Sequence, residues 1–292
     1  MIQKTVSEKL KEQFGCKVYK LSLDAGFTCP NRDGTIAKGG CIFCSASGGG
    51  EFAEKIKDDI ACRLEKAKNR VENKAKGSKY IAYFQAFSGT YGKIERLRQL
   101  YYDAISPDYI VGLSVATRPD CLPDEVISLL AEINKIKPVT VELGLQTSND
   151  KTAEYIRRGY KSEVFTSAVA RLKRAGIETV AHMIIGLPFE TAEDAVNTAR
   201  FIGDSGADGI KFHLLHVLRG TDLEKEYLCG RFDTLTLEEY TDILKACLEV
   251  LPEDIIIHRL TGDGAKRALV APLWSADKKR VLNHIKRELN IK

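Results

Sequence analysis

Short runs rich in valine, isoleucine, tyrosine and phenylalanine recur along the chain, and more polar stretches separate them. We predict strands at residues 17–24, 80–87, 108–116, 139–146, 178–187, 209–218 and 254–260. Apolar residues recur at helical spacing over 123–136, 162–176 and 191–206, and these segments begin at Pro, Ser and Thr. This regular alternation predicts an α/β fold in which helices cover a parallel sheet.

The polar residues of the predicted strands favour a partial (β/α)6-type barrel over an open sheet. In the run VTVELGLQ, the apolar residues share one face, and the other face holds Thr140, Glu142, Gly144 and Gln146. Other strands carry polar side chains near their later part, where barrel active sites are built: Tyr83, Gln85, His182, Lys211, His213, His258 and Arg259. Any one of them is more often a satisfied core group, but their recurrence over several strands predicts a shared cavity.

Length and composition indicate one large folded domain. The chain has 292 residues, of which 44% are hydrophobic and 29% are charged, as in an ordinary globular protein. We expect an N-terminal extension at 1–16, the barrel at 17–265 and a basic C-terminal helix at 266–292, with a solvated charged helix over 51–79. The first residues lack a signal-peptide core and no apolar run is long enough to cross a membrane, which predicts a cytoplasmic protein without membrane contact.

Three of the eight cysteines, Cys29, Cys41 and Cys44, have the spacing C-x11-C-x2-C. In a reducing compartment, closely spaced thiols are better candidates for metal ligands than for disulfides. Three thiolates suit a cubane iron–sulfur cluster whose fourth iron stays open. A structural zinc site remains an alternative, but Cys16 or Cys62 would have to supply its fourth ligand. A thioredoxin-like redox pair fits less well, because the C-x2-C pair follows the first strand of a long β/α array.

The cysteine segment resembles the radical S-adenosylmethionine (SAM) superfamily, in which an aromatic residue such as Phe43 precedes the last cysteine. The usual superfamily spacing is C-x3-C-x2-C, and the longer spacing is similar to that of proteins near the Elongator catalytic subunit. Matching segments span nearly the whole chain: 24–35, 39–44, 83–91, 116–122, 141–147, 157–160, 182–190, 211–221 and 258–264. Together they resemble the YhcC/YtqA (MnmL-like) group of radical SAM proteins.

This resemblance implies a [4Fe–4S] cluster on Cys29, Cys41 and Cys44, with SAM bound to the open iron. Cleavage of SAM would then produce a 5′-deoxyadenosyl radical that takes a hydrogen atom from the substrate. The implied SAM contacts are Phe43, Ile185 and Leu187 for the adenine, Gln85, Ser88 and Thr90 for the amino group, Glu142 for the ribose or sulfonium, Arg157 or Arg158 for the carboxylate, and Gln146 as a further contact.

On the substrate side, the candidate catalytic residues are His213, His258 and Arg259, which could orient a carboxylate or phosphate. Cys121 could in principle donate a hydrogen atom. The resemblance implies that the substrate is tRNA and that the reaction converts the carboxymethylaminomethyl group of the wobble uridine to aminomethyl. Eight Lys and Arg residues against two acidic residues in 266–292 agree with an RNA partner.

A reducing partner such as flavodoxin or ferredoxin is also implied. Two other functions stay open at this point. One is a radical SAM enzyme that acts on another RNA or on a small metabolite. The other is a zinc-stabilised RNA-binding protein without catalysis.

Overall fold

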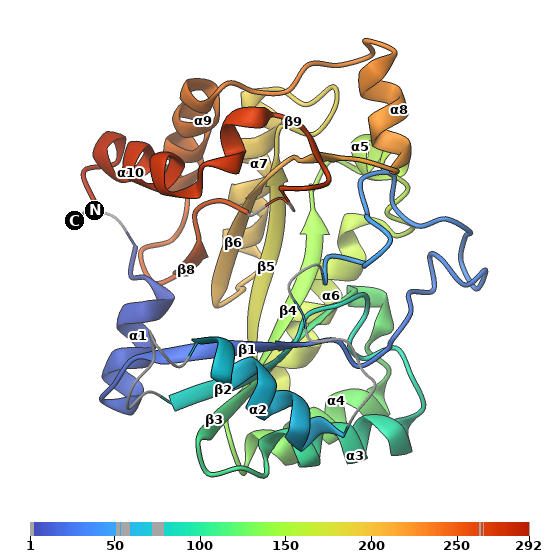
Figure 1. Cartoon of the computed structure of the whole chain (residues 1–292), viewed down its shortest axis with the longest axis vertical. Coiled ribbons are helices and arrows are strands. Elements are labelled where there is room, and N and C mark those ends of the chain that lie inside the picture. The colour runs from blue at the N-terminus through green and yellow to red at the C-terminus, as the bar shows by residue number, and fades with distance from the viewer. Residues whose placement is uncertain are drawn as a thin grey trace.

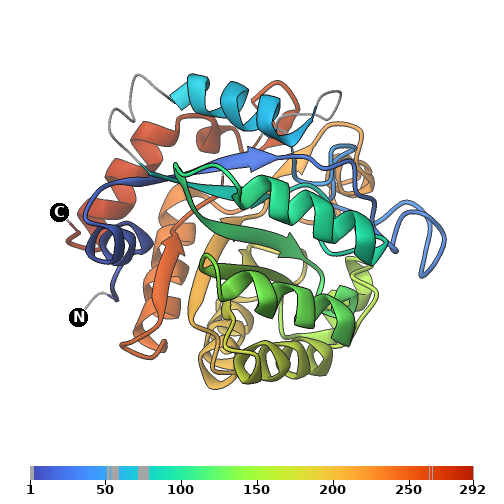
Figure 2. The same ribbon diagram turned by 90° about the horizontal axis from the view of Figure 1, so that it is seen from below.

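The computed structural model describes residues 3–50, 53, 59–71, 79–262, 264 and 266–291. Neighbouring strands pair in parallel in the order β1-β2-β3-β4-β5-β6-β8. Their bounds are β1 (Val18–Leu23), β2 (Lys79–Phe84), β3 (Ile110–Thr117), β4 (Val139–Gln146), β5 (Glu178–Ile185), β6 (Gly209–Leu214) and β8 (Ile256–Arg259). The sheet curls into a half-barrel with helices on its outer side (Figures 1 and 2), so the predicted partial barrel is confirmed.

Amphipathic helices cover the convex face of the sheet. They are α2 (Ile60–Val71), α3 (Ile94–Ile105), α4 (Asp124–Asn134), α6 (Ser162–Arg174), α7 (Ala192–Asp204) and α9 (Leu237–Glu249). In α6, for example, Phe165, Val169 and Leu172 are fully buried in the main core, and the helix contacts β4 and β5. Thr191 begins α7 as expected, because its hydroxyl accepts from Asp194 N while the Asp194 carboxylate accepts from Thr191 N.

Shorter elements gather where the strands end. They are the 3-10 helix η2 (Pro119–Cys121), α5 (Asp150–Tyr155), β7 (Val217–Leu218), α8 (Asp222–Leu228), β9 (Leu269–Ala271) and the 3-10 helix η3 (Leu273–Ala276). The predicted strand 209–218 is therefore divided, since β6 ends at Leu214 and β7 pairs antiparallel with β9. Local sequence does not show this break, because the partner of β7 comes much later in the chain.

In the described part of the basic tail, the α-helix is α10 (Lys278–Glu288), which follows η3. Asp277 accepts a hydrogen bond from Arg280 N at 3.1 Å and caps α10. Of the helix expected at 51–79, α2 covers Ile60–Val71, and residues 51–52, 54–58 and 72–78 lie outside the described residues. In the described part of the chain, none of the helices has the length and apolar character needed to traverse a bilayer.

The N-terminal helix α1 (Val6–Phe14) joins the two edge strands of the half-barrel. Ile257 of β8 donates its backbone N–H to Lys4 O at 2.9 Å, and Thr5 forms a bridge with Ile257. The helix also contacts β1. The segment before β1 therefore covers the side on which the sheet does not close on itself.

Candidate active site

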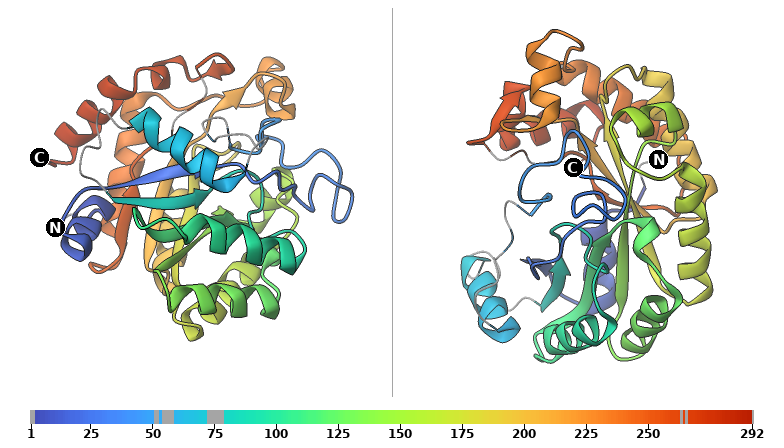
Figure 3. Two further views of the ribbon diagram at one scale, coloured as in Figure 1. Left: turned by 60° about the horizontal axis from the view of Figure 1, so that its bottom comes forward. Right: turned by 90° about the vertical axis from the view of Figure 1, so that its right-hand side faces the viewer.

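The loop after β1 folds back on itself and brings Cys29 close to Cys41. Within the 11-residue stretch, Ile36 N donates to Pro30 O at 2.8 Å and Gly34 N to Ala37 O at 3.2 Å. Gly40 has φ +82°, and a Cβ there would lie 2.8 Å from Arg32 Nε, so this position requires glycine. The long spacing between the first two cysteines is thus a small projecting turn, which is part of the blue loop in Figures 1 and 3.

Backbone hydrogen bonds fix the Cys41–Cys44 turn to distant parts of the chain. Ile42 N donates to Ile156 O at 3.1 Å, after α5, and Leu223 N of α8 donates to Ile42 O at 2.9 Å. The buried Ile42 side chain belongs to a second small hydrophobic core. This packing holds the last two cysteines over the end of the barrel.

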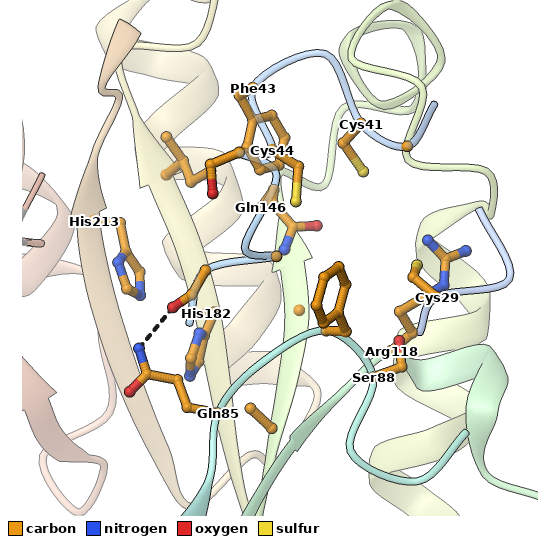
Figure 4. Close-up of a pocket in the computed structure, with 18 of the residues that line it drawn as sticks. Cys29, Cys41, Phe43, Cys44, Gln85, Ser88, Arg118, Gln146, His182 and His213 are labelled. Atoms are coloured by element: carbon orange, nitrogen blue, oxygen red, sulfur yellow. Dashed lines mark hydrogen bonds between the residues drawn. The ribbon is translucent and has the colours of Figure 1, made fainter. Parts of the chain in front are cut away.

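The three cysteine side chains face a common space (Figure 4). Asn31 is buried, and its Nδ2 lies 3.5 Å from Cys41 Sγ while it donates to Arg157 O at 2.6 Å. Burial raises the pKa of the Cys41 thiol to about 12, and the neighbouring Cys44 adds to this rise while Arg118 opposes it. Thiols in such surroundings become thiolates when a cationic metal centre binds them.

The donor set suits a cluster better than a single ion. Thiolates around one zinc ion lie only about 3.8 Å apart, given Zn–S bonds of about 2.3 Å. The thiolates of a cubane cluster each bind a different iron and therefore lie farther apart. Among the described residues, no three His, Cys, Asp or Glu side chains form a group that could hold one metal ion. Neither Cys16 nor Cys62 lines this cavity, and none of the eight cysteines forms a disulfide.

A cavity of about 320 Å³ extends from the cysteines into the lumen. Its wall combines the cysteine loop with side chains from β2, β3, β4, β5, β6 and β8. A volume of this size is typical of a small-molecule site. The expected common cavity therefore exists, and it lies where the strands end.

The floor of the cavity is organised around the fully buried carboxylate of Glu142. Both of its oxygens accept hydrogen bonds, and the donors come from β1, β2, β3, β5 and β6: Lys20, Tyr83 at 2.7 Å, Ser114 at 2.9 Å, His182 at 2.8 Å and Lys211. A carboxylate offers about four lone-pair sites. Glu142 is thus fully engaged by the protein, and its expected contact with SAM would require one donor to be displaced.

Charges near the floor shift several pKa values. Burial alone would raise the pKa of Glu142, but Lys20, Lys211 and His182 hold it well below its ordinary value. Burial lowers the pKa of His182 to about 4 although Glu142 pulls in the other direction. Near neutral pH the floor therefore contains an ionised carboxylate and a neutral His182 imidazole.

Several residues expected to contact SAM are committed to protein partners. Arg157 is half-exposed, forms an ion pair with Asp222 at 2.7 Å and does not line the cavity. Arg158 is buried and donates to Leu145 O at 2.6 Å and Thr147 O at 2.5 Å. Neither guanidinium is thus available for the SAM carboxylate in this arrangement.

Arg158 instead supports the backbone at the end of β4. Its two carbonyl acceptors flank Gln146, which has φ +63°. Non-glycine residues adopt this conformation at a cost and persist in it only when the surroundings hold them. Arg158 therefore holds the strained turn whose Gln146 side chain lines the cavity (Figure 4).

Three further residues expected to contact SAM lie away from the cavity, and a fourth lines it but is bonded to the protein. Thr90 bonds to Thr117 Oγ1 at 2.6 Å and to Cys121 O, and it lines a different surface cavity. Ile185 and Leu187 are buried in the two hydrophobic cores, and it is Ile184 that lines the cavity from β5. Gln85 lines the cavity while donating to Gly49 O at 2.8 Å, which is the bond drawn in Figure 4.

The substrate-side candidates are separated by the structure. His213 and Arg259 line the cavity, and the His213 ring lies 5.0 Å from the His182 ring. His258 lies beside Gly209 and 3.9 Å from Glu178, where β6 and β5 begin, and does not reach the cavity. Cys121 is buried and also lies outside the cavity wall.

Sequence analysis missed four residues that shape the site: Lys20, Asn31, Ser114 and Arg118. Lys20 and Ser22 alternate with leucines on β1, and this period-2 pattern was the available signal. Arg118 follows β3, forms an ion pair with Asp120 at 2.7 Å and donates to Arg158 O at 2.9 Å. No local pattern distinguishes Asn31 or Ser114, because their partners lie on distant segments.

Comparison with known proteins shows which family the chain resembles over nearly its whole length. The model of the Radical SAM superfamily matches residues 29–202, and that of the Radical_SAM C-terminal domain matches residues 207–290. The chain is 45% identical to the uncharacterized protein YtqA of Bacillus subtilis, over 98% of this chain and 88% of that protein. It is 38% identical to protein YhcC of Escherichia coli, over 96% of this chain and 90% of YhcC.

More distant likenesses cover part of the other protein. The chain is 27% identical to a tRNA uridine(34) acetyltransferase of Methanocaldococcus jannaschii, over 52% of this chain and 28% of that protein. The solved structure of Methanocaldococcus infernus Elp3 superposes with a TM-score of 0.69 at 17% identity, over 94% of this chain and 64% of the Elp3 chain. At that identity the likeness shows the fold.

A half-barrel with three cysteines at the mouth of its lumen defines the class of the protein. The chain belongs to the radical SAM superfamily, whose enzymes use a [4Fe–4S] cluster and S-adenosylmethionine. Within that superfamily it groups with YtqA and YhcC, as the sequence resemblance predicted.

The lowered pKa of His182 predicts a specific pH dependence of stability. Between its unfolded pKa of about 6.5 and its folded pKa of about 4, the unfolded chain binds the extra proton, so stability falls as pH falls. From pH 7.5 to 5.5, the free energy of unfolding should decrease by about 1 kcal/mol more for the wild type than for His182→Gln. Anaerobic urea denaturation at both pH values measures this difference. Equal decreases for the wild type and His182→Gln would contradict the lowered pKa of His182.

Proposed function

We propose that this chain cleaves SAM at a [4Fe–4S] cluster held by Cys29, Cys41 and Cys44 and uses the resulting radical to modify tRNA. The modification is the conversion of a carboxymethylaminomethyl group on the wobble uridine to aminomethyl. Two-electron oxidation of the carboxymethyl methylene, with SAM as the oxidant, would give an imine, and its hydrolysis by water would release the amine and the two carbons as glyoxylate. The observation that carries the proposal is the convergence of three cysteine thiols on one cavity that leads into a polar lumen.

When bound, the cluster and SAM supply the radical that abstracts hydrogen from the substrate. The chain itself supplies the thiolates and a donor, Asn31 Nδ2, directed at Cys41 Sγ. Hydrogen bonds to cluster sulfurs raise the reduction potential of such centres. A reducing partner such as flavodoxin or ferredoxin delivers the electron.

SAM would occupy the part of the cavity next to the cysteines. Phe43 and Ile184 provide apolar surface for the adenine, while Ser88 and Gln146 provide polar groups for the methionine end or the ribose. Arg32 and Arg118 are the guanidinium groups beside the cysteines, since Arg32 bonds to Cys44 O at 2.8 Å and Arg118 affects the pKa of Cys41. Glu142 acts from below by holding Tyr83, His182 and Lys211 in fixed positions.

Two observations support tRNA as the substrate. One relative at 27% identity is named a tRNA uridine(34) acetyltransferase, and position 34 is the wobble position. The basic helix α10 also presents exposed Lys279, Arg280 and Arg287. In Figure 1 it lies with α8 and α9 at the upper end, toward which β4 points. Phosphate contacts from such residues position RNA without reading its sequence.

The cluster assignment predicts metal content. Anaerobically purified wild-type protein should be brown and contain about four irons per chain. Replacement of Cys29, Cys41 or Cys44 by serine should remove most of the iron, because each supplies one of three protein ligands. Cys16→Ser is the matched control and should retain the wild-type iron content. Colourless wild-type protein with one zinc would refute the cluster.

The substrate assignment predicts a change in one nucleoside. Reduced enzyme incubated with SAM and tRNA that carries carboxymethylaminomethyluridine should convert that nucleoside to aminomethyluridine. Nucleoside analysis by mass spectrometry measures the conversion, and the cysteine variants should show none. If SAM is cleaved to 5′-deoxyadenosine while the nucleoside stays unchanged, another RNA or a small metabolite is the substrate.

An RNA partner also predicts a salt dependence of binding. The logarithm of the tRNA affinity should fall linearly with the logarithm of the salt concentration, because phosphate contacts release counterions. The double variant Lys279→Gln/Arg280→Gln should reduce that slope by about 1–2. Lys135→Gln/Lys173→Gln, on exposed positions at the other end of the barrel, is the control and should keep the wild-type slope. Filter binding of tRNA at several salt concentrations measures the slope, and a salt-independent affinity would contradict an RNA partner.

A further inference from the structure

The residues that line the cavity carry more positive than negative charge. Glu142 is the one carboxylate among the described lining residues. Five cationic side chains line the same cavity: Arg32, Arg118, Arg158, Lys211 and Arg259. Arg118, Arg158 and Lys211 are buried, whereas Arg32 and Arg259 are partly buried. Cationic groups withdrawn from water need partners.

Four of these cations have partners within the protein. Arg32 donates to Cys44 O at 2.8 Å and to Ser45 O at 2.5 Å. Arg118 is paired with Asp120, and Arg158 is bonded to the backbone at the end of β4. Lys211 is paired with Glu142, which it shares with Lys20.

Arg259 is the exception. Among the residues that the structure describes, its guanidinium has no hydrogen bond or ion pair. It ends β8 and is paired in register with Lys211 of β6, so two cations stand on adjacent strands of the cavity wall. Burial lowers the pKa of Lys211 to about 7 against the pull of Glu142, and Lys20 and Arg259 add to the shift. This part of the wall has an excess of positive charge.

An unused polar atom lies nearby. The Nε2 atom of His213 is buried and has no hydrogen-bond partner among the described residues. Burial is the main cause that holds the pKa of His213 well below its ordinary value, and the nearby His182 and Arg259 add to it. The ring is therefore neutral. A neutral imidazole can donate one N–H to an acceptor. Among the described residues, Arg259 and His213 thus both lack an acceptor.

We propose that Arg259, with His213 and Lys211 beside it, forms a carboxylate-binding site that receives the carboxymethyl carboxylate of the modified uridine. The identity of this occupant rests on the tRNA reaction proposed above. Binding of the carboxylate places the adjoining methylene group inside the lumen. The site would thereby select the carboxymethylated nucleoside over neutral analogues.

SAM also has a carboxylate, but Arg259 is on the wrong side of the cavity to bind it. Arg32 and Arg118 are the arginines that neighbour the cluster cysteines, since Arg32 donates to Cys44 O at 2.8 Å and Arg118 affects the pKa of Cys41. Arg259 instead pairs in register with Lys211, whose amino group bonds to Glu142 on the floor. In agreement with this position, it affects the pKa values of Tyr83, His182, Lys211 and His213. The carboxylate site is therefore assigned to the substrate.

The test compares two anticodon stem-loops, one with carboxymethylaminomethyluridine and one with its neutral carboxamide. Wild-type holoenzyme should prefer the carboxylate in kcat/KM by on the order of 10–100-fold, as for a charge-assisted hydrogen bond. Arg259→Gln should lose that preference, because its kcat/KM for the carboxylate stem-loop should fall to the value for the carboxamide. Arg259→Lys should retain part of the preference, and Arg174→Gln, on the exposed end of α6, should retain all of it.

SAM binding separates the two sources of carboxylate. Equilibrium dialysis should give the same SAM affinity, within about twofold, for wild type and for Arg259→Gln and Arg259→Lys. A parallel loss of SAM affinity with an unchanged preference between the stem-loops would overturn the proposal, because Arg259 would then serve SAM.

A small probe tests the site even if the RNA reaction fails. N-methylglycine reproduces the carboxymethylamino group, and N-methylglycinamide is its neutral counterpart. Saturation-transfer NMR should show saturable binding of N-methylglycine to wild-type holoenzyme, and neither binding of the amide nor binding to Arg259→Gln. If N-methylglycine binds in this way but the enzyme leaves tRNA unmodified, the proposed function is refuted and the carboxylate-binding site is supported. Absence of saturable binding to the wild type would refute the site.

Discussion

The buried carboxylate of Glu142 is the interaction on which the lumen depends. Its donors come from five other strands, so one side chain connects β1 through β6. A carboxylate buried without such partners would cost several kcal/mol. With Glu142 in the lumen, the neighbouring strands must therefore pair in the register that also places Lys20, Ser114 and Lys211 next to its carboxylate. The polar floor thus ties the pairing of the strands to the geometry of the cavity.

Above this floor, the cavity has two chemically different ends. The cysteine loop lies over one end, where the turn 41–44 is fastened to α5 and α8 by Ile42. Cations and imidazoles from β5, β6 and β8 occupy the other end. Most of the charge is neutralised inside the protein, which leaves few groups free for ligands. Radical chemistry requires such a site, because stray donors near a reactive carbon would compete with the substrate.

Much of the site followed from alternation along single strands. Period-2 spacing placed Glu142, His182, Lys211 and His213 on the lumen face, and the structure agrees for all four. The same spacing places Ile184 rather than Ile185 on the lumen face with His182, and Ile185 lies in the main core instead. For His258 and Arg259 alternation could not decide, since the pairing of β6 with β8 shifts between Ile210 and Lys211. Arg157 and Arg158 were expected to bind the SAM carboxylate, but both guanidinium groups are bonded to other parts of the protein. The sequence does not show that these partners exist.

The sequence by itself determined the β/α order of the fold, the three cysteines and the polar faces of β2, β4, β5 and β6. These properties depend on residue type and spacing along the chain, which local geometry translates directly into structure. Only the tertiary structure decided which polar groups pair with one another: Arg158 with the end of β4, Lys20 and Lys211 with Glu142, and Arg259 with none of the described residues. Such pairings join segments far apart in the chain. Their partners are set by the curl of the sheet and by burial, which no local pattern encodes.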